Sequence, residues 1–348
     1  DGAGAGGARA DGSGAGVAGA GVVGAGVAGS GGVGADGAGS GVARAGAAGA
    51  IREPGVAYQW YTGTSFRLPE KVAYGASVTT PGGIVCIGGE TATGYSKKVF
   101  LLRWDPARRK LRFKDLPDLP VALANAGAAL IGQTVYVVGG ENAERALTGL
   151  FSLDLAQPAG WQRLPDVPLA ISHSAVVAQS GMIYVIGGRS KTASGVSTLH
   201  NTVFRYDPSA MIWQQLRPVG DGIHPPHLAA ANAVADDKGG ILVIGGDDGR
   251  VFHELETLNA RIAAASGDVL RRRLLSRKLA IIGSHPGFWR GILRYDPSGD
   301  RWTGLGDLPV PAPVTTTAVR WNDAVVIPCG EIKPGTRSAD ILMGRLNP

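Results

Sequence analysis

Five short apolar segments of this chain end in the same way, and this repetition constrains the fold more than any other feature. Each is a run of mostly aliphatic residues followed by two glycines, or by cysteine and glycine in the last copy, and then by a charged residue. The first glycines of the first four pairs are separated by 51, 48 and 58 residues. Periods of this size are typical of repeated β-sheet units. The segments are IVCIGGE (84–90), VYVVGGE (135–141), IYVIGGR (183–189), ILVIGGD (241–247) and VVIPCGE (325–331).

Further strands complete each unit. A strand rich in small residues precedes each glycine-ended strand, as in NAGAALIG, and a third strand follows, as in TVFRYDP. The fourth strand carries an aromatic residue, so that Tyr206 and Trp213, and likewise Tyr295 and Trp302, are seven positions apart. This pattern resembles the kelch repeat, which implies an all-β fold, a β-propeller whose blades leave few exposed edges. The alternative is an open sandwich with coincidental glycines.

Two segments depart from the repeat. Residues 251–290 interrupt the fourth blade, where Leu255, Leu258 and Ile262 recur at helical spacing, which predicts two short helices that cap one face of the propeller. The strands AYQWYTG and TSFRLPEKV, after residue 56, resemble the second half of a partial sixth blade.

Residues 1–55 are a Gly/Ala-rich low-complexity segment, and the propeller domain is expected to span residues 56–348. Such a segment cannot bury enough apolar surface to offset its ordering entropy. We therefore expect it to be disordered or to be a misread start, for example a frame shift that replaced the first half of the sixth blade. It lacks the basic patch and continuous apolar stretch of a signal peptide, so the sequence itself indicates no compartment.

The charge pattern gives little evidence for a macromolecular partner. The net charge is +6, and five basic residues lie between Arg271 and Lys278. Without interleaved aromatic residues, this cluster is better explained by a solvated helix face than by a nucleic-acid site. The sequence contains no uncharged run of 18 apolar residues, so no membrane span is predicted. The two cysteines, Cys86 and Cys329, are too few for a disulfide framework or a zinc site and are interpreted as small buried residues.

The blade pattern predicts a polar mouth at one end of the propeller. The loop after the second strand and the linker that enters the first strand emerge on the same face of a blade, where a small-molecule site is expected. The six histidines include no pair at the i,i+4 spacing of metal ligands, so no metal site is predicted. The mouth should contain Glu90, Glu141, Arg189, Asp247 and Glu331 after the strands, and Tyr74, Asn125, His173 and His227 in the linkers. As substrate-binding residues we predict Glu90, Glu141, Arg189, His173 and His227.

The last glycine-ended strand leads into a densely charged turn. Glu331, Lys333 and Arg337 lie within seven positions, around a Pro–Gly pair. Such a pair folds the chain back, so Arg337 can return to the side of Glu331. Spacing alone fits both a surface salt bridge of little energetic value and a pair that performs acid/base chemistry and anion binding.

The sequence of this turn, GEIKPGTR, is similar to a loop of the kelch-type N-acetylneuraminate epimerases, the sialic acid mutarotases. AYGASVTTPGGIVCIGGETATG resembles the last blade of those enzymes but lies near the start of this chain, as in their cyclically permuted branch. The resemblance covers residues 56–348 and implies six blades, a periplasmic or secreted location, and cofactor-independent interconversion of the α and β anomers of N-acetylneuraminate by ring opening. It implies that Glu331 is the catalytic base, that Arg337 holds the sugar carboxylate, and that Lys333 adds to the field or braces the loop.

The implied partner is a small sugar acid, with no nucleic acid or membrane, and the oligomeric state stays open. Where the family commonly has an arginine before the third blade, this chain has Ile171 and Ser172, so one anion contact is expected to be lost. A non-catalytic kelch module that binds a protein or glycan is the alternative, and an exposed aromatic and apolar rim would favour it. A copper oxidase of the galactose oxidase type needs a cross-linked Tyr–Cys pair and two His ligands, and neither cysteine lies in a suitable loop.

Overall fold

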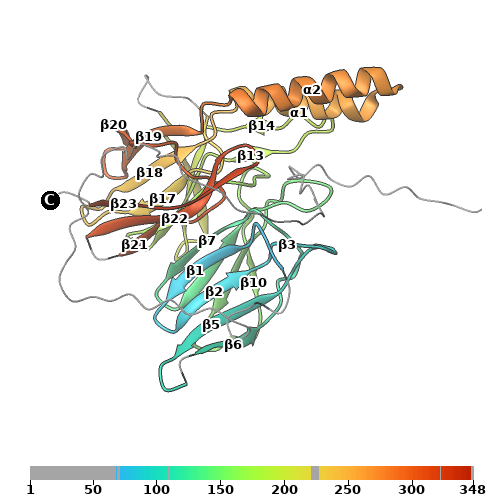
Figure 1. The fold of residues 1–348 in the computed structure, drawn as a ribbon. Coiled ribbons are helices and arrows are strands. Elements are labelled where there is room, and N and C mark those ends of the chain that lie inside the picture. Colours follow the sequence, from blue (N-terminus) through green and yellow to red (C-terminus); the bar gives the residue numbers. More distant parts are fainter. Residues whose placement is uncertain (1–67, 69–70, 109, 221–226, 322, 346–348) are drawn as a thin grey trace, which may run out of the picture.

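The computed structural model describes residues 68, 71–108, 110–220, 227–321 and 323–345. Within these ranges, five antiparallel sheets follow one another along the chain and pack around a common axis (Figure 1). The kelch-type β-propeller predicted from the repeat is therefore confirmed, with five blades. The two strands assigned to a partial sixth blade and the segment 1–55 lie outside the described residues.

Blades 1 to 4 have four strands each and blade 5 has three. Blade 1 contains β1 (Ala76–Thr80), β2 (Gly83–Ile87), β5 (Val99–Asp105) and β6 (Lys110–Leu116). Blade 2 contains β7 (Gly127–Ile131), β8 (Thr134–Val138), β9 (Leu150–Asp154) and β10 (Gln162–Leu164). Blade 3 contains β11 (Ala175–Gln179), β12 (Met182–Ile186), β15 (Val203–Asp207) and β16 (Ile212–Leu216). Blade 4 contains β17 (Asn232–Ala235), β18 (Ile241–Gly246), β19 (Trp289–Asp296) and β20 (Arg301–Asp307), and blade 5 contains β21 (Val319–Trp321), β22 (Ala324–Lys333) and β23 (Thr336–Arg345). Two short ladders, β3 (Glu90–Thr91) with β4 (Gly94–Tyr95) and β13 (Arg189–Ser190) with β14 (Thr198–Leu199), extend blades 1 and 3.

Tryptophan residues of the repeat connect blades 2, 3 and 4 to the preceding blade. Tyr206 and Trp213 lie opposite each other in the β15–β16 ladder, with ring centroids 4.9 Å apart. The indole nitrogen of Trp213 donates a hydrogen bond of 2.8 Å to the Pro165 carbonyl of the preceding blade. Trp161 and Trp302 make the equivalent bonds in blades 2 and 4. Each indole thus satisfies its one donor between blades, and the Trp302 ring is buried.

The double glycines lie where each blade meets the linker that enters the next. Gly187 has φ of 60°, and a Cβ atom there would lie 2.2 Å from the carbonyl oxygen of Leu228. The N–H of Gly188 donates to that same oxygen at 2.7 Å. Blades 1 and 2 repeat this arrangement. The motif therefore recurs because both a left-handed backbone and a close approach to the next blade exclude a side chain.

We expect Gly187→Ala to lower the free energy of unfolding by more than about 3 kcal/mol, because it adds a backbone clash to the cost of a left-handed residue. Gly181 is the matched control, since it has φ of 76° but no atom near its missing Cβ. Gly181→Ala should cost only about 1 kcal/mol. Urea denaturation of both variants tests this, and equal losses would contradict the close-approach argument.

Blade 5 differs at this position. Cys329 replaces the first glycine, has φ of 44° and is exposed. The interpretation of Cys329 as a buried residue is therefore wrong, because the residue lies at a shift in the β22–β23 register, between Pro328 and Gly330. Cys86, in β2, is half-buried, and burial raises the pKa of its thiol.

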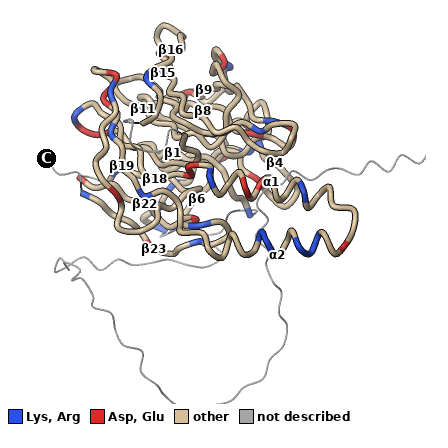
Figure 2. Tube along the Cα trace, turned by 90° about the horizontal axis from the view of Figure 1, so that it is seen from above, with Lys and Arg blue, Asp and Glu red and all other residues tan. Residues whose placement is uncertain are grey.

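The insertion in blade 4 forms two helices, α1 (Arg250–Ala264) and α2 (Asp268–Ser284), as predicted. They pack on each other through Leu258, Ala265 and Leu274. α1 lies against the propeller. In Figure 2, the basic residues of α2 appear in blue along the helix. Arg271, Arg272, Arg273 and Arg277 are exposed, which confirms a solvated helix face. Among the described residues, no helix is long and apolar enough to cross a membrane.

Candidate active site

Five residues in equivalent positions form a ring at one end of the propeller axis. Each precedes the inner strand of its blade and has a left-handed backbone, with φ between 54° and 58°. Backbone N–H groups link successive members: Asn125 donates to Tyr74, His173 to Asn125, and Ala230 to His173. These bonds hold a conformation that costs about 1 kcal/mol or more for residues with a side chain. The members of this ring are Tyr74, Asn125, His173, Ala230 and Thr315.

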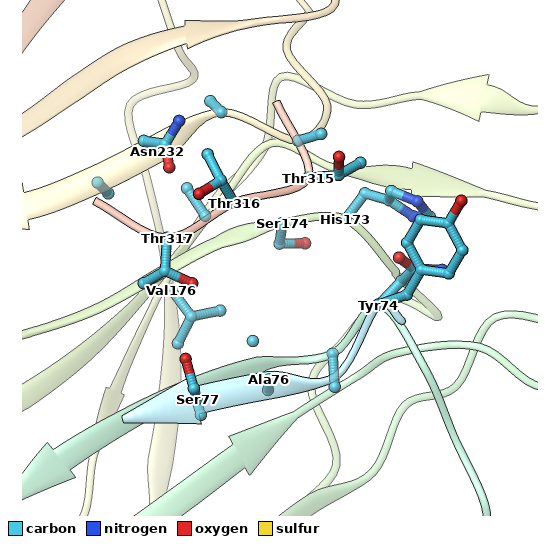
Figure 3. A pocket seen from close by; sticks show the side chains of 18 of the residues that line it. Tyr74, Ala76, Ser77, His173, Ser174, Val176, Asn232, Thr315, Thr316 and Thr317 are labelled. Atoms are coloured by element: carbon cyan, nitrogen blue, oxygen red, sulfur yellow. The ribbon is translucent and has the colours of Figure 1, made fainter. Parts of the chain in front are cut away.

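The axial channel below this ring is lined by inner strands of small residues. Figure 3 shows Tyr74, His173 and Thr315 at one end of the channel and Ser77 and Thr317 toward the other. The small residues predicted for the first strand of each blade thus lie where the blades crowd the axis.

A cavity opens above the ring, between the blades and α1. All five charged residues predicted at the mouth line it, since each pairs through its backbone with the linker of its own blade. The placement of these residues was therefore predicted correctly from blade topology, whereas their roles stay predictions. The charged residues that line the cavity are Glu90, Glu141, Arg189, Lys191, Asp247, Glu256 and Glu331.

A buried ion-pair network forms one wall of the cavity. The side chains of Glu141 and Arg189 are only 5% and 15% exposed, and the Nη2 atom of Arg189 lies 3.3 Å from Oε1 of Glu141. Ser172 donates to Oε2 of Glu141 at 2.9 Å, and Asn125 donates to Oε1 at 3.1 Å. Lys191 lies 3.7 Å from Oε1. Burial by itself raises the pKa of Glu141, but His173, Arg189, Lys191 and the Ser172 hydrogen bond together lower it.

The network also fixes α1 over the cavity. Glu256 of α1 accepts hydrogen bonds from the backbone N–H and the hydroxyl of Ser197, both at 2.7 Å. It pairs with Arg189 at 3.3 Å, and the Arg189 guanidinium lies 5.2 Å from the ring centroid of Phe252, another α1 residue. The helical insertion is thus tied to blade 3 as well as to its own blade.

Every nitrogen of the Arg189 guanidinium has a protein acceptor. Nε bonds His173, Nη1 bonds Ser197 and Glu256, and Nη2 reaches both oxygens of Glu141. Arg189 is therefore held mainly by protein groups in this arrangement, although it lines the cavity. Ser172 and Ile171, at the place of the expected arginine, are both buried, with Ser172 bonded to Glu141.

His173 is held in its neutral form. Burial and the charge of Arg189 lower its pKa to about 3, although Glu141 acts in the opposite direction. Because Nδ1 accepts the 3.2 Å hydrogen bond from Nε of Arg189, the imidazole proton resides on Nε2.

We expect the neutral His173 to make the protein lose stability on acidification. The unfolded chain takes up a proton on this side chain below pH 6.5, whereas the folded protein does so only near pH 3. Between pH 6.5 and 4.5 the loss should amount to about 2 kcal/mol. In His173→Gln, whose amide oxygen can still accept from Arg189, the difference between denaturation free energies at these two pH values should shrink by that amount. An unchanged difference would show that His173 titrates normally in the folded protein.

Glu331 and Arg337 lie opposite each other in the β22–β23 ladder, so the predicted return of the arginine is confirmed. The turn between them has Gly335 at φ of 74°, as Pro–Gly turns of type II require. Oε1 of Glu331 accepts a 2.6 Å hydrogen bond from the N–H of Gly335. Within the described part of the chain, Arg337 forms no ion pair with Glu331 and is exposed. The salt-bridge interpretation of this turn is therefore wrong.

Three predicted site residues do not line the cavity. Arg337 and Lys333 lie on the turn beside it, next to Pro334, which does line it. His227 lies outside the cavity, because the residue of blade 4 that occupies the ring is Ala230.

Tyr95, Lys191 and Glu256 also line the cavity but were not predicted from the sequence. Lys191 could have been found, since it lies two positions after Arg189, directly after the short strand β13. Nothing in the sequence marked Glu256, because its contact depends on how the helices dock. Burial and the charges of Glu141 and Glu90 raise the pKa of Tyr95. Across the residues that the structure describes, no group of three His, Cys, Asp or Glu side chains is placed to hold a metal ion.

Blades of this topology, with a charged cavity at one end of the axis, define a kelch β-propeller. The family model described as N-acetylneuraminate epimerase matches residues 116–348, well over half of the chain, so this chain belongs to the N-acetylneuraminate epimerase family. The match begins at Leu116, where blade 1 ends.

Individual relatives agree with this assignment. The N-acetylneuraminate epimerase of Haemophilus influenzae (strain PittEE) is 29% identical over 232 residues, which cover 66% of this chain and 59% of the relative. The one of Brucella melitensis biotype 1 is 30% identical over 232 residues, covering 64% and 57%. This chain therefore spans less than two-thirds of the curated relatives it matches. The solved structure titled "Structure of YjhT" superposes with a TM-score of 0.54 at 23% identity over 67% of this chain and 68% of that chain, which supports the fold.

Proposed function

We propose that this protein is a cofactor-independent mutarotase that interconverts the α and β anomers of N-acetylneuraminate. The observation that carries the proposal is the pair Glu331 and Arg337, opposed across one turn beside the cavity and not paired with each other. A carboxylate and a guanidinium that neutralise each other would serve only the turn. Left apart, one can exchange a proton while the other binds an anion. The identity of the sugar, N-acetylneuraminate, is taken from the names of the relatives.

The chemistry requires little more than positioned acid/base groups. Glu331 removes the proton of the anomeric hydroxyl while the ring oxygen is protonated, and the ring opens to the ketone. Rotation about the adjacent C–C bond and closure on the other face give the second anomer. Arg337 holds the carboxylate of the sugar in a bidentate contact, and Lys333 adds positive charge to the same turn.

The cavity surface favours an enzyme over a non-catalytic kelch module. Its apolar lining residues, Phe252, Leu255 and Phe288, are buried or half-buried, whereas seven charged side chains reach it. A protein-binding module would expose an aromatic and apolar rim there.

Proton NMR of freshly released α-N-acetylneuraminate tests the proposal. With the protein present, the β anomer should appear faster than in buffer, whereas the equilibration of freshly dissolved α-glucose, which lacks a carboxylate, should keep its buffer rate. If folded protein leaves the N-acetylneuraminate rate unchanged, the proposal fails. If only glucose equilibration is accelerated, the substrate is wrong although the chemistry stands.

A further inference from the structure

Ring opening needs an acid as well as a base, and the cavity holds a second carboxyl group next to Glu331. Asp247 and Glu331 occupy equivalent positions in the neighbouring blades 4 and 5. Each follows a glycine with a left-handed backbone, Gly246 or Gly330. Each pairs through its backbone with its own linker, at Ala229 and Val314, and both line the cavity. Two carboxyl groups thus face one space from adjacent blades.

The hydrogen bonds of Asp247 also leave its carboxyl group able to exchange a proton. Oδ1 accepts a 2.8 Å hydrogen bond from the N–H of Gly249, while Oδ2 has no hydrogen-bond partner and Asp247 has no ion pair within the described ranges. Glu141 and Glu256, in contrast, are held by Arg189 and by hydroxyl or amide donors. Glu90 belongs to blade 1, which is not adjacent to blade 5 among the blades that the structure describes.

The surroundings let Asp247 keep its proton up to about pH 6. Burial raises its pKa to about 6, the charges of Asp248 and Glu256 act in the same direction, and the Gly249 hydrogen bond and the charge of His253 oppose them. These groups come from the loop that enters α1 and from α1 itself, and Glu331 faces the same cavity from blade 5. Other polar side chains at the mouth are less suited to supply a proton. His173 is neutral, and Arg189 is both permanently charged and bonded to protein groups.

We infer that Asp247 is the general acid that protonates the ring oxygen of the sugar, opposite Glu331 as the base. In ring opening, Glu331 takes the anomeric hydroxyl proton, the C–O bond of the ring breaks, and Asp247 gives its proton to the departing oxygen. In closure, Asp247 takes that proton back as the oxygen attacks the ketone, and Glu331 returns its proton to the carbonyl oxygen. The cycle leaves both groups as they began. This assignment rests on the proposed mutarotase function.

The test is the pH profile of kcat/KM for N-acetylneuraminate anomerisation, measured by NMR exchange from pH 4.5 to 8 and corrected for the uncatalysed rate. The wild type should lose activity as the pH rises through about 6, because the acid form of Asp247 disappears. Asp247→Asn keeps an acceptor for Gly249 but no transferable proton, so it should be slower by about 10²-fold or more and lose that limb of the profile. Asp247→Glu should be slower but keep a titrating limb. Asp115→Asn, at an exposed position in β6, is the matched control and should behave as wild type.

The outcomes separate the two claims. If Asp247→Asn stays within threefold of wild type and keeps the same limb while Glu331→Gln is inactive, the acid assignment is overturned and the mutarotase function stands. If Asp247→Asn is slow but the limb persists, Asp247 acts only on the architecture of the site, and the assignment is overturned as well. If the wild type does not accelerate anomerisation, the function fails and the assignment fails with it. Thermal denaturation confirms that each variant is folded.

Discussion

Replacing Glu331 with glutamine should lower kcat for anomerisation by about 10²- to 10⁴-fold, with a small change in KM. The amide keeps the size of the side chain and can still accept the hydrogen bond from Gly335, so the turn should survive. What disappears is the capacity to take a proton, and a positioned base is worth about that factor. The measurement is NMR exchange between the anomers at several sugar concentrations.

Two further variants make this result specific. Arg337→Gln should mainly raise KM, because it removes the group proposed to hold the sugar carboxylate and leaves the base in place. Glu254→Gln, at an exposed α1 position paired with Arg277, should leave both constants unchanged. A Glu331→Gln enzyme with wild-type kcat would remove Glu331 from the chemistry whatever Arg337 does.

Replacing Arg189 with glutamine should lower the free energy of unfolding by about 3–5 kcal/mol, because it leaves buried carboxylates without their main cation. Glu141 would keep only Lys191 and its neutral donors, and Glu256 would lose its only ion pair among the described residues. The link between α1 and blade 3 should weaken at the same time, which hydrogen exchange of the α1 amides would show. Urea denaturation at pH 7 gives the energy.

Arg163 offers the matched control, since it pairs with Asp166 but its side chain is 65% exposed. Arg163→Gln should cost less than about 1 kcal/mol. A double-mutant cycle with Glu141→Gln should then recover part of the Arg189 loss, because the two side chains lie in contact. Equal effects of the two arginine substitutions would mean that the network contributes nothing beyond a surface pair.

The blades could be predicted from the sequence because equivalent positions in successive blades require the same types of residue. The double glycine is required wherever a strand end meets the next linker, and Tyr–Trp pairs occupy the same outer positions, so both leave a periodic trace. The charged mouth followed from this, since blade topology alone places Glu141 or Asp247 beside the linker. The Pro–Gly turn likewise fixed the register of Glu331 and Arg337.

What escaped prediction depends on contacts between elements far apart in the chain. Glu256 reaches Ser197 only because α1 docks over blade 3, and no spacing records that docking. Arg189 looked like an anion-binding group because its charge is visible in the sequence and its five acceptors are not. The fourth ring position was misplaced at His227, although aligning the small-residue strands would have indicated Ala230, two residues before Asn232.

In the ring of left-handed residues, the backbone forms part of the scaffold, whereas the side chains line the cavity. Its members share one backbone conformation, and the first four are linked by equivalent backbone bonds, yet its side chains are a phenol, an amide, an imidazole, a methyl group and a hydroxyl. The backbone of the ring therefore does not depend on which side chain stands at each of its positions. Substitutions at Ala230 or Thr315 can change the chemistry of the cavity one position at a time, while the backbone conformation of the ring stays the same.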